Sequence, residues 1–138
     1  MELSYDIGGG DFVNAGRASS AVKGILKQLN ISAVLIKRVV IALYEAEVNV
    51  AAHASAGKIS VSITKDVIRI NIRDKGPGIA DIELAMQEGY STASKEVREM
   101  GFGAGMGLPN IRKNSDTFNI SSTPGEGTEL EIINRLSN

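Results

Sequence analysis

The sequence predicts an α/β (α+β) fold of two layers, in which helices cover one face of a mixed, mostly antiparallel sheet. Two neighbouring segments, residues 58–64 and 67–72, alternate between apolar and polar side chains, which is typical of half-buried strands. Two earlier segments carry apolar residues at helical spacing. With 138 residues, the chain has room for a single domain, residues 1–138, in which helices and strands share one core.

The composition excludes several classes of protein. Hydrophobic residues make up 43%, charged residues 22% and aromatic residues 4%, so a globular core must be built from Ile, Val, Leu and Ala. The net charge is −1 and no basic stripe interleaves with aromatic residues, which argues against a nucleic-acid partner. Without cysteine and with a single histidine, His53, a zinc site is not expected. No signal peptide and no membrane span are recognisable, which predicts a cytoplasmic protein.

The N-terminal part is predicted to form an edge strand and two helices. Residues 2–7 alternate like a strand, and three glycines at 8–10 end it. Asp11 is the expected N-cap of a first helix, residues 12–29, which Asn30 ends. Ser32 is expected to cap a longer second helix, residues 33–54. On its helical wheel the expected solvent side carries Lys37, Tyr44 and Glu47.

The opposite side of this second helix carries three polar residues among small and apolar ones. Glu45, Asn49 and His53 are spaced i, i+4 and i+8, so they lie on one face. The small neighbours Ala42 and Ala46 leave space beside them, which is typical of a pocket wall. The alternative is that the inward face is only approximate and the three side chains are partly solvated at the helix end.

The two alternating segments predict an antiparallel hairpin, connected by Lys65 and Asp66. Its expected inward residues are Ile59, Val61, Ile63, Ile68, Ile70 and Ile72. The second strand is expected to end at Asp74, at the beginning of a Gly-x-Gly turn.

A short helix, two strands and a long segment are expected in the remainder. Asp81 should start a helix through Met86 that Gly89 stops. Residues 90–107 form a long segment of the kind that usually serves as a functional lid or is disordered. A third helix is expected over residues 108–116, with Pro109 at an early position. Strands at 117–123 and 128–135 follow, with a turn between them.

Glycines gather between Asp74 and Leu108. Seven of the 15 glycines lie there, at positions 76, 78, 89, 101, 103, 105 and 107. Taken alone, such a cluster is better explained as a flexible surface loop, but glycines that run into a helix can also present backbone N–H groups to phosphates. The spacing matches neither a P-loop nor a dinucleotide-binding fingerprint.

The polar residues around these glycines suit nucleotide chemistry. The amide oxygen of Asn49 is a suitable ligand for Mg²⁺, which usually takes only one or two protein groups. A carboxylate one turn away, Glu45, could orient or deprotonate a nucleophile. Asp74, beyond a strand end, could accept a hydrogen bond from an exocyclic amine such as that of adenine.

Together these motifs resemble the ATPase superfamily shared by gyrase, MutL and sensor histidine kinases, whose ATP-binding fold is called the Bergerat fold. Residues 45–53 resemble its N box, residues 74–79 its first glycine box and residues 101–108 its second glycine box. Gly125-x-Gly127-Thr128 fits as well. The resemblance covers almost the whole chain. It is strongest to the anti-sigma factor serine/threonine kinases, especially the switch-protein serine kinases of the stressosome pathway.

The resemblance implies ATP and Mg²⁺ as cofactors. Asn49 would ligate Mg²⁺, Glu45 would be the catalytic base, and Asp74 would bind the adenine amine with Thr128 assisting through water. Residues 90–107 would close over the phosphates. The further nucleotide contacts that the resemblance implies are His53, Gly76, Gly78, Ile79, Thr92, Gly101, Gly103, Ala104, Gly105, Met106, Gly107 and Leu108.

The implied function is a serine/threonine kinase that phosphorylates a small antagonist protein of the STAS type in a partner-switching pathway. A sigma factor or a phosphatase would be a further partner, a homodimer is compatible with the resemblance, and neither nucleic acid nor membrane is expected. One alternative is a non-catalytic module that senses ATP or ADP and binds a protein. Another is a detached histidine-kinase catalytic domain.

Overall fold

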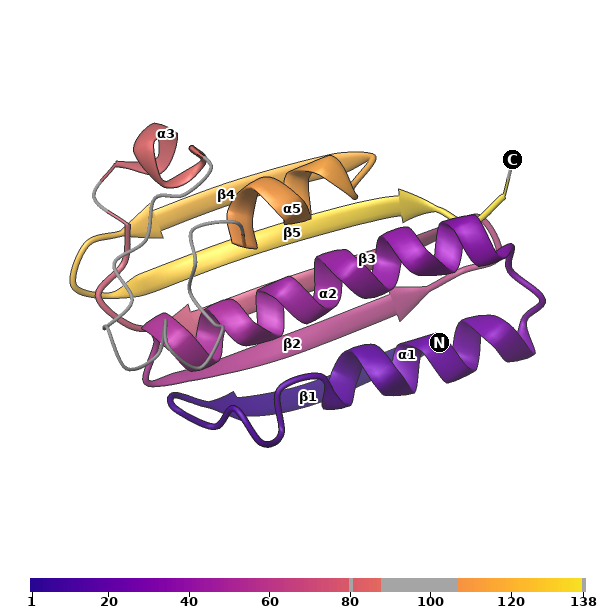
Figure 1. The fold of residues 1–138 in the computed structure, drawn as a ribbon, viewed down its shortest axis with the longest axis horizontal. Coiled ribbons are helices and arrows are strands. Elements are labelled where there is room, and N and C mark those ends of the chain that lie inside the picture. Colours follow the sequence, from indigo (N-terminus) through magenta and orange to yellow (C-terminus); the bar gives the residue numbers. More distant parts are fainter. Residues whose placement is uncertain (80, 88–106, 138) are drawn as a thin grey trace.

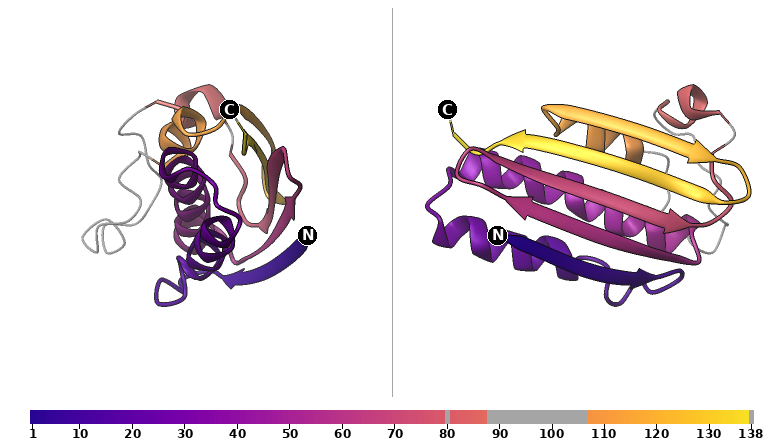
Figure 2. Two further views of the ribbon diagram at one scale, coloured as in Figure 1. Left: turned by 90° about the vertical axis from the view of Figure 1, so that its right-hand side faces the viewer. Right: turned by 180° about the vertical axis from the view of Figure 1, so that it is seen from behind.

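The structure of the chain, a computed structural model, describes residues 1–79, 81–87 and 107–137. Its strands are β1 (Glu2–Gly8), β2 (Ala56–Ile63), β3 (Val67–Lys75), β4 (Thr117–Thr123) and β5 (Gly127–Arg135). Its helices are α1 (Arg17–Gln28), α2 (Ala33–His53), α3 (Ile82–Ala85) and α5 (Gly107–Lys113). The five strands form one sheet in the order β1-β2-β3-β5-β4, and all four pairings between them are antiparallel. Because α1, α2 and α5 lie on one face of this sheet (Figure 1 and Figure 2), the predicted two-layer fold is confirmed.

The β2–β3 hairpin forms the middle of the sheet, and its register explains the alternating sequence. The pairs are Ile59 with Ile72, Val61 with Ile70, and Ile63 with Ile68, and all six side chains are buried. Since strand side chains alternate between the two faces, this register puts the apolar residues toward the helices and leaves polar residues on the outer face. The Thr64 N–H closes the connection by donating to the Val67 carbonyl at 2.9 Å. The predicted hairpin and its inward residues are therefore confirmed.

Helix α2 runs along the inner face of the sheet. The Ser32 hydroxyl accepts a hydrogen bond from the Leu35 N–H at 3.3 Å, which confirms the predicted N-cap. Buried small and aliphatic residues recur along its length, among them Val39, Ala42 and Ala46. Its 21 residues carry it from the α1–α2 connection to the opposite end of the sheet (Figure 1), where the candidate site lies.

The core between the two layers is aliphatic. In the described part of the chain, every buried hydrophobic residue is Ile, Val, Leu or Ala, as the aromatic content of 4% predicts. No helix in the described part of the chain is long and apolar enough to cross a membrane.

Helix α1 begins later than the sequence predicts. It starts at Arg17 after Gly16, whose φ is +102°, instead of following Asp11. Asp11 accepts hydrogen bonds from the backbone and side-chain amides of Asn14, at 3.3 and 2.9 Å, and so closes a local turn. The C-terminal boundary is as predicted, because Asn30 has a φ of +58°, the left-handed conformation that commonly follows a helix.

Glu47 was expected on the solvent side of α2, and this prediction is wrong. Its side chain is 2% exposed and accepts the N–H groups of Gly16, Ala18 and Ser19 at 2.7, 3.2 and 2.8 Å. The first N–H groups of a helix have no partner within it, and Gly16 has no side chain to cap them. Glu47 therefore caps α1 from the neighbouring helix.

The C-terminal elements follow the prediction closely. Strand β4 has its expected bounds, β5 begins one position earlier at Gly127, and α5 ends at Lys113, before the predicted Asp116. Asp81 caps α3 by accepting the Leu84 N–H at 3.0 Å. The predictions for Gly89 and for residues 90–106 lie outside the described residues.

Candidate nucleotide-binding site

The candidate site lies at the end of the two layers where α2 ends (Figure 1). The end of β3, the β4–β5 turn and the beginning of α5 lie at the same end. The Ser55 N–H, just after α2, donates to the Lys75 carbonyl at 2.8 Å, and the Gly125 N–H donates to the Pro77 carbonyl at 2.7 Å. These hydrogen bonds bring together three segments that the sequence singled out: residues 45–53, 74–79 and 125–128.

Glu45 is half-buried between α2 and α5. Burial raises the pKa of this carboxyl above its ordinary value, and a hydrogen bond with the Asn110 side chain counteracts part of the shift. The beginning of α5 is close, since a Cβ atom on Gly107 would lie 3.7 Å from Glu45 Oε2. A carboxyl whose pKa is raised is a stronger base once it is deprotonated. The geometry therefore suits a general base.

Asn110, which holds Glu45, was not predicted from the sequence. It lies on α5 one turn after Gly107, and the hydrogen bond to Glu45 places it on the face toward α2. A side-chain amide can donate to a carboxylate and fix its orientation. Its position one turn into the helix that follows the glycine run is the one sequence signal that could have drawn attention to it.

Asn49 and His53 follow Glu45 on the same face of α2, and both are half-buried. Burial lowers the pKa of His53 and so favours its neutral form. Partial exposure of all three side chains is what a pocket wall requires, although a solvated helix end would show it too. The described residues contain no cluster of three or more His, Cys, Asp or Glu that could hold a metal. Mg²⁺ does not need such a cluster, because one or two protein oxygens usually suffice.

Asp74 is oriented by a hydrogen bond from the neighbouring strand β5. The Thr128 N–H donates to Asp74 Oδ1 at 3.0 Å. Burial raises the pKa of Asp74, and the bond from Thr128 counteracts part of the shift. Within the described part of the chain, no group donates to Asp74 Oδ2. The carboxylate is thus held in place by Oδ1, while Oδ2 has no donor among the described residues, which fits recognition of an exocyclic amine.

A pair of hydroxyl groups continues from Thr128 into strand β4. Thr128 Oγ1 and Ser122 Oγ lie 2.9 Å apart, and Ser122 Oγ accepts the Ile79 N–H at 2.7 Å. Ser122 therefore connects the loop after β3 to the β4–β5 hairpin. It was not predicted from the sequence, although it shares the half-buried face of β4 with Phe118 and Ile120.

The glycines of the site are required first by contacts within the protein. Gly78 has a φ of +73°, and a Cβ atom there would lie 2.5 Å from the Thr123 carbonyl oxygen. Gly127, with a φ of +154°, has no room for a Cβ atom against the Asp74 carbonyl. A Cβ atom on Gly76 would lie 3.0 Å from the Cα atom of Ala54, just after α2. These glycines let the three segments pack closely and so position Asp74, while backbone contact with a nucleotide stays a prediction.

The remaining predicted site residues fall into two groups. Gly107, Leu108 and Ile79 are described: Gly107 begins α5, the side chain of Leu108 is buried in the core, and Ile79 packs partly against that core. The others lie outside the described residues, namely Thr92, Gly101, Gly103, Ala104, Gly105 and Met106.

Comparison with known proteins supports the resemblance found in the sequence. The profile of the family described as histidine kinase-, DNA gyrase B-, and HSP90-like ATPase matches residues 34–138. The serine/threonine-protein kinase RsbT of Bacillus subtilis (strain 168) is 32% identical over 118 residues, which cover 83% of this chain and 83% of that protein. The anti-sigma F factor of Caldanaerobacter subterraneus subsp. tengcongensis is 33% identical over 124 residues, which cover 86% and 83%. The chain therefore belongs to the family of histidine kinase-, DNA gyrase B- and HSP90-like ATPases.

Proposed function

We propose that this chain is an ATP-dependent protein serine/threonine kinase that phosphorylates a small antagonist protein in a partner-switching pathway. The observation that carries the proposal is Glu45, a half-buried carboxyl of raised pKa in the second half of α2, one helical turn before Asn49. Membership of an ATPase family supports binding of ATP. The name of one relative, a serine/threonine-protein kinase, supports the activity, and that of another, an anti-sigma F factor, supports the class of pathway.

Two described residues have separate proposed roles in binding ATP and Mg²⁺. Asp74 accepts a hydrogen bond from the adenine amine through Oδ2, while the Thr128 N–H holds Oδ1. The amide oxygen of Asn49 is the proposed protein ligand of Mg²⁺. ATP with Mg²⁺ supplies the transferable phosphoryl group when it is bound. We also propose that residues 1–138 form a single domain and that the protein is cytoplasmic.

Glu45 is the proposed general base of the reaction. Its carboxylate accepts the proton of the substrate hydroxyl, and the hydrogen bond with Asn110 holds the carboxylate in one orientation. Only the deprotonated form can accept that proton. Because burial raises the pKa of Glu45, the activity should fall as the solution becomes acidic.

The test is phosphoryl transfer from labelled ATP and Mg²⁺ to a candidate substrate, the protein encoded next to this chain. Acid-stable label on serine or threonine is the expected result, and Glu45→Gln should abolish it while ATP binding is retained. The matched control is Glu2→Gln, an exposed residue of β1 at the opposite end of the sheet, which should keep both properties. Acid-labile label would instead indicate a histidine kinase. ATP binding without any label would indicate a nucleotide-sensing module.

The role of Asn49 needs a separate test because it concerns the metal. Asn49→Ala should weaken ATP binding much more in the presence of Mg²⁺ than in EDTA, since the alanine removes only the metal ligand. Asn71→Ala, on the outer face of β3, is the matched control and should change neither affinity. Equal losses with Mg²⁺ and with EDTA would show that Asn49 has a structural role instead.

A further inference from the structure

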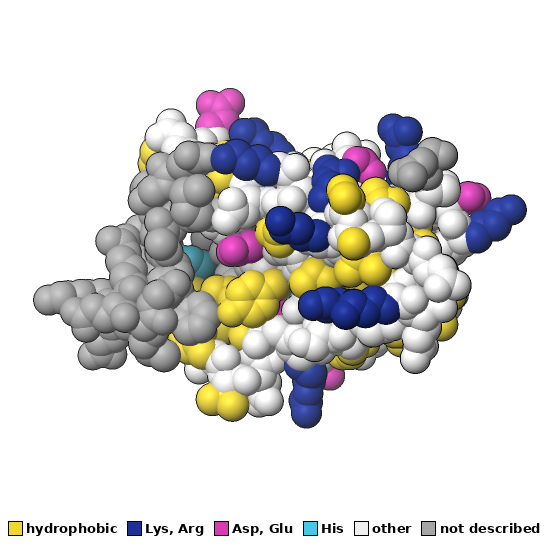
Figure 3. All heavy atoms as spheres, turned by 45° about the vertical axis from the view of Figure 1, so that its right-hand side comes forward, with side chains coloured by type: hydrophobic (Ala, Val, Ile, Leu, Met, Phe, Trp, Pro, Cys, Tyr) yellow, Lys and Arg dark blue, Asp and Glu magenta, His cyan; other side chains and the backbone are white. Residues whose placement is uncertain are grey.

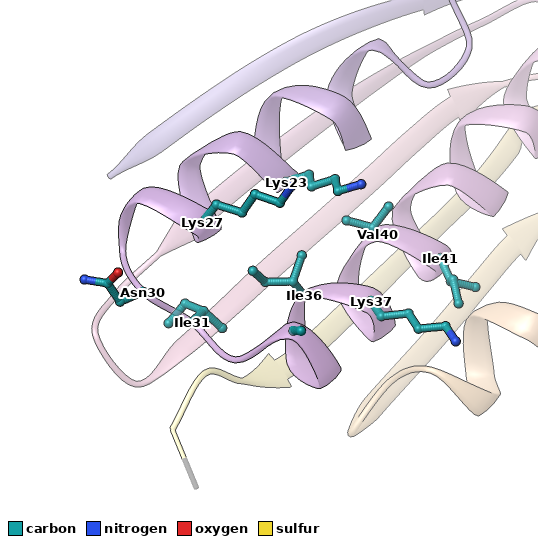
Figure 4. Close-up of a pocket in the computed structure, with 9 residues that line it drawn as sticks. Lys23, Lys27, Asn30, Ile31, Ile36, Lys37, Val40 and Ile41 are labelled. Atoms are coloured by element: carbon teal, nitrogen blue, oxygen red, sulfur yellow. The ribbon is translucent and has the colours of Figure 1, made fainter.

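A groove between α1 and α2 lies at the opposite end of α2 from the candidate nucleotide-binding site. Its volume is about 580 Å³, and its lining includes Ile31, Val40 and Ile41 together with Lys23, Lys27 and Lys37. Figure 4 shows Lys23 and Lys27 extending from α1 toward α2, which contributes Lys37, Val40 and Ile41. The groove is formed by the first half of α2, whereas Glu45, Asn49 and His53 lie in the second half.

The floor of this groove is aliphatic. Ile31 and Val40 pack partly against the core, while Ile41 is half-buried and lies outside the core cluster. In the same part of the chain Leu29 and Val34 are 48% and 71% exposed. These two residues do not line the groove but are the sequence neighbours of Asn30 and Ala33, which do. Exposed apolar surface with a polar rim is typical of an interaction site. A groove of aliphatic side chains between two helices has the shape that accepts the apolar face of a third helix.

The charged residues that line the groove are all lysines. Lys23, Lys27 and Lys37 are exposed, and no carboxylate in the described part of the chain forms an ion pair with them. Lys23 and Lys27 are one helical turn apart, a like-charge pair that is slightly unfavourable for α1 itself. The whole chain carries a net charge of −1, so this positive charge is a local feature. Figure 3 shows Lys and Arg side chains around exposed hydrophobic ones on the helical side of the molecule.

We propose that this groove binds an acidic amphipathic helix of a partner protein. The apolar residues of that helix, at positions i, i+4 and i+7, enter between α1 and α2. Its Asp and Glu side chains meet Lys23, Lys27 and Lys37, which supply the charge complementarity. This goes beyond the proposed kinase function, because a partner held here leaves the other end of α2 free.

The test uses the full chain and a fluorescent peptide designed as an amphipathic helix, with leucines at i, i+4 and i+7 and glutamates on both flanks. A second peptide has lysine in place of every glutamate, and a third is scrambled. Fluorescence anisotropy should show binding of the glutamate peptide alone, and the binding should weaken with added salt. In NMR spectra the methyl signals of Ile31, Val40 and Ile41 should shift on its addition.

Variants of the groove distinguish specific binding of the peptide from non-specific binding. Reversing Lys23, Lys27 or Lys37 to glutamate should weaken binding of the glutamate peptide by up to about fivefold for each lysine and should allow the lysine peptide to bind. Ile41→Ser should weaken binding without unfolding the protein, because Ile41 lies outside the core cluster. The control is Lys58→Glu on the outer face of β2, which should change nothing.

Several results would overturn the proposal. One is that none of the three peptides binds, and another is that all three bind equally. A third is that reversing the lysines leaves the affinity for the glutamate peptide unchanged. Sedimentation velocity adds another: if the lysine variants lose a dimer that the wild type forms, the groove belongs to a second copy of this chain. Asp74→Asn should leave peptide binding intact, so failure of the nucleotide chemistry and failure of the docking proposal are distinguishable.

Discussion

Replacing Glu47 with glutamine tests how α1 is held against the rest of the molecule. The buried carboxylate of Glu47 accepts three N–H groups at the beginning of α1, with Gly16 and Ala18 on Oε2 and Ser19 on Oε1. Glutamine has nearly the same shape but only one acceptor oxygen, because an NH₂ group replaces the other. In its better orientation the remaining oxygen keeps the bonds from Gly16 and Ala18. The NH₂ group then faces the N–H of Ser19, donor against donor.

The magnitude follows from these contacts. A hydrogen bond to a charged group contributes about 1.5–3 kcal/mol, and a buried N–H left without an acceptor costs about as much. The bond from Ser19 is lost, and those from Gly16 and Ala18 lose their charged acceptor near the positive end of a helix. We therefore expect Glu47→Gln to lower the free energy of unfolding by about 2–4 kcal/mol. That is a large share of the roughly 5–15 kcal/mol of a typical domain.

Urea unfolding at neutral pH, followed by far-ultraviolet circular dichroism, measures this loss. Amide hydrogen exchange at Ser19 should accelerate as well, because its N–H no longer has an acceptor. Glu126→Gln, in the exposed β4–β5 turn, is the control and should stay within about 0.5 kcal/mol of the wild type. A Glu47→Gln protein as stable as this control would refute the reasoning, since the carboxylate would then contribute nothing to the docking of α1.

Three further predictions concern the candidate site and its glycines. Asp74→Asn should weaken ATP binding about tenfold or more in isothermal titration, because a charged acceptor is lost; Asp66→Asn in the β2–β3 turn should bind normally, and unchanged affinity of Asp74→Asn would contradict the assignment. Burial raises the pKa of Glu45, so the folded state binds this proton more tightly than the unfolded state, and the protein loses stability as pH rises through the raised pKa. Glu45→Gln should therefore be more stable than the wild type at neutral pH, with a difference that shrinks below the ordinary pKa of a glutamate; a difference in urea unfolding that is independent of pH would show the explanation to be wrong. Gly78→Ala should destabilise by about 1–3 kcal/mol because of its positive φ and its contact with β4, whereas Gly24→Ala, in open space on α1, should stabilise by about 0.5–1 kcal/mol; equal effects in thermal unfolding would refute this contrast.

Local patterns explain what could be predicted from the sequence. The alternation at residues 58–64 and 67–72 determines which face of each strand is buried, and that face determines the register of the hairpin. Ser32 caps its own helix through a residue three positions away, so the signal lies within one turn. The fold and the meeting of residues 45–53, 74–79 and 125–128 followed from such signals together with the family resemblance.

The features that were not predicted depend on contacts between elements far apart in the chain. Glu47 lies 31 positions from the Gly16 N–H that it accepts, and a helical wheel cannot show that a neighbouring helix begins there. Asn110 and Ser122 escaped prediction for the same reason, because each acts by contacting another element. Asp11 shows the complementary error. It is a good capping residue and was predicted to begin α1, but its carboxylate accepts hydrogen bonds from Asn14 in a turn that precedes the helix.

The position of β5 between β3 and β4 also has a consequence for biosynthesis. Strands β1, β2 and β3 leave the ribosome early and can pair with one another, but the second edge of β3 has no partner until residues 127–135 are made. That edge belongs to a strand rich in isoleucine. In a nascent chain, an unpaired apolar edge strand can pair with the wrong segment or with another chain. The bond from Thr128 to Asp74 forms across the same junction. The adenine-binding end proposed here can therefore take shape only when the last strand of the sheet has been inserted.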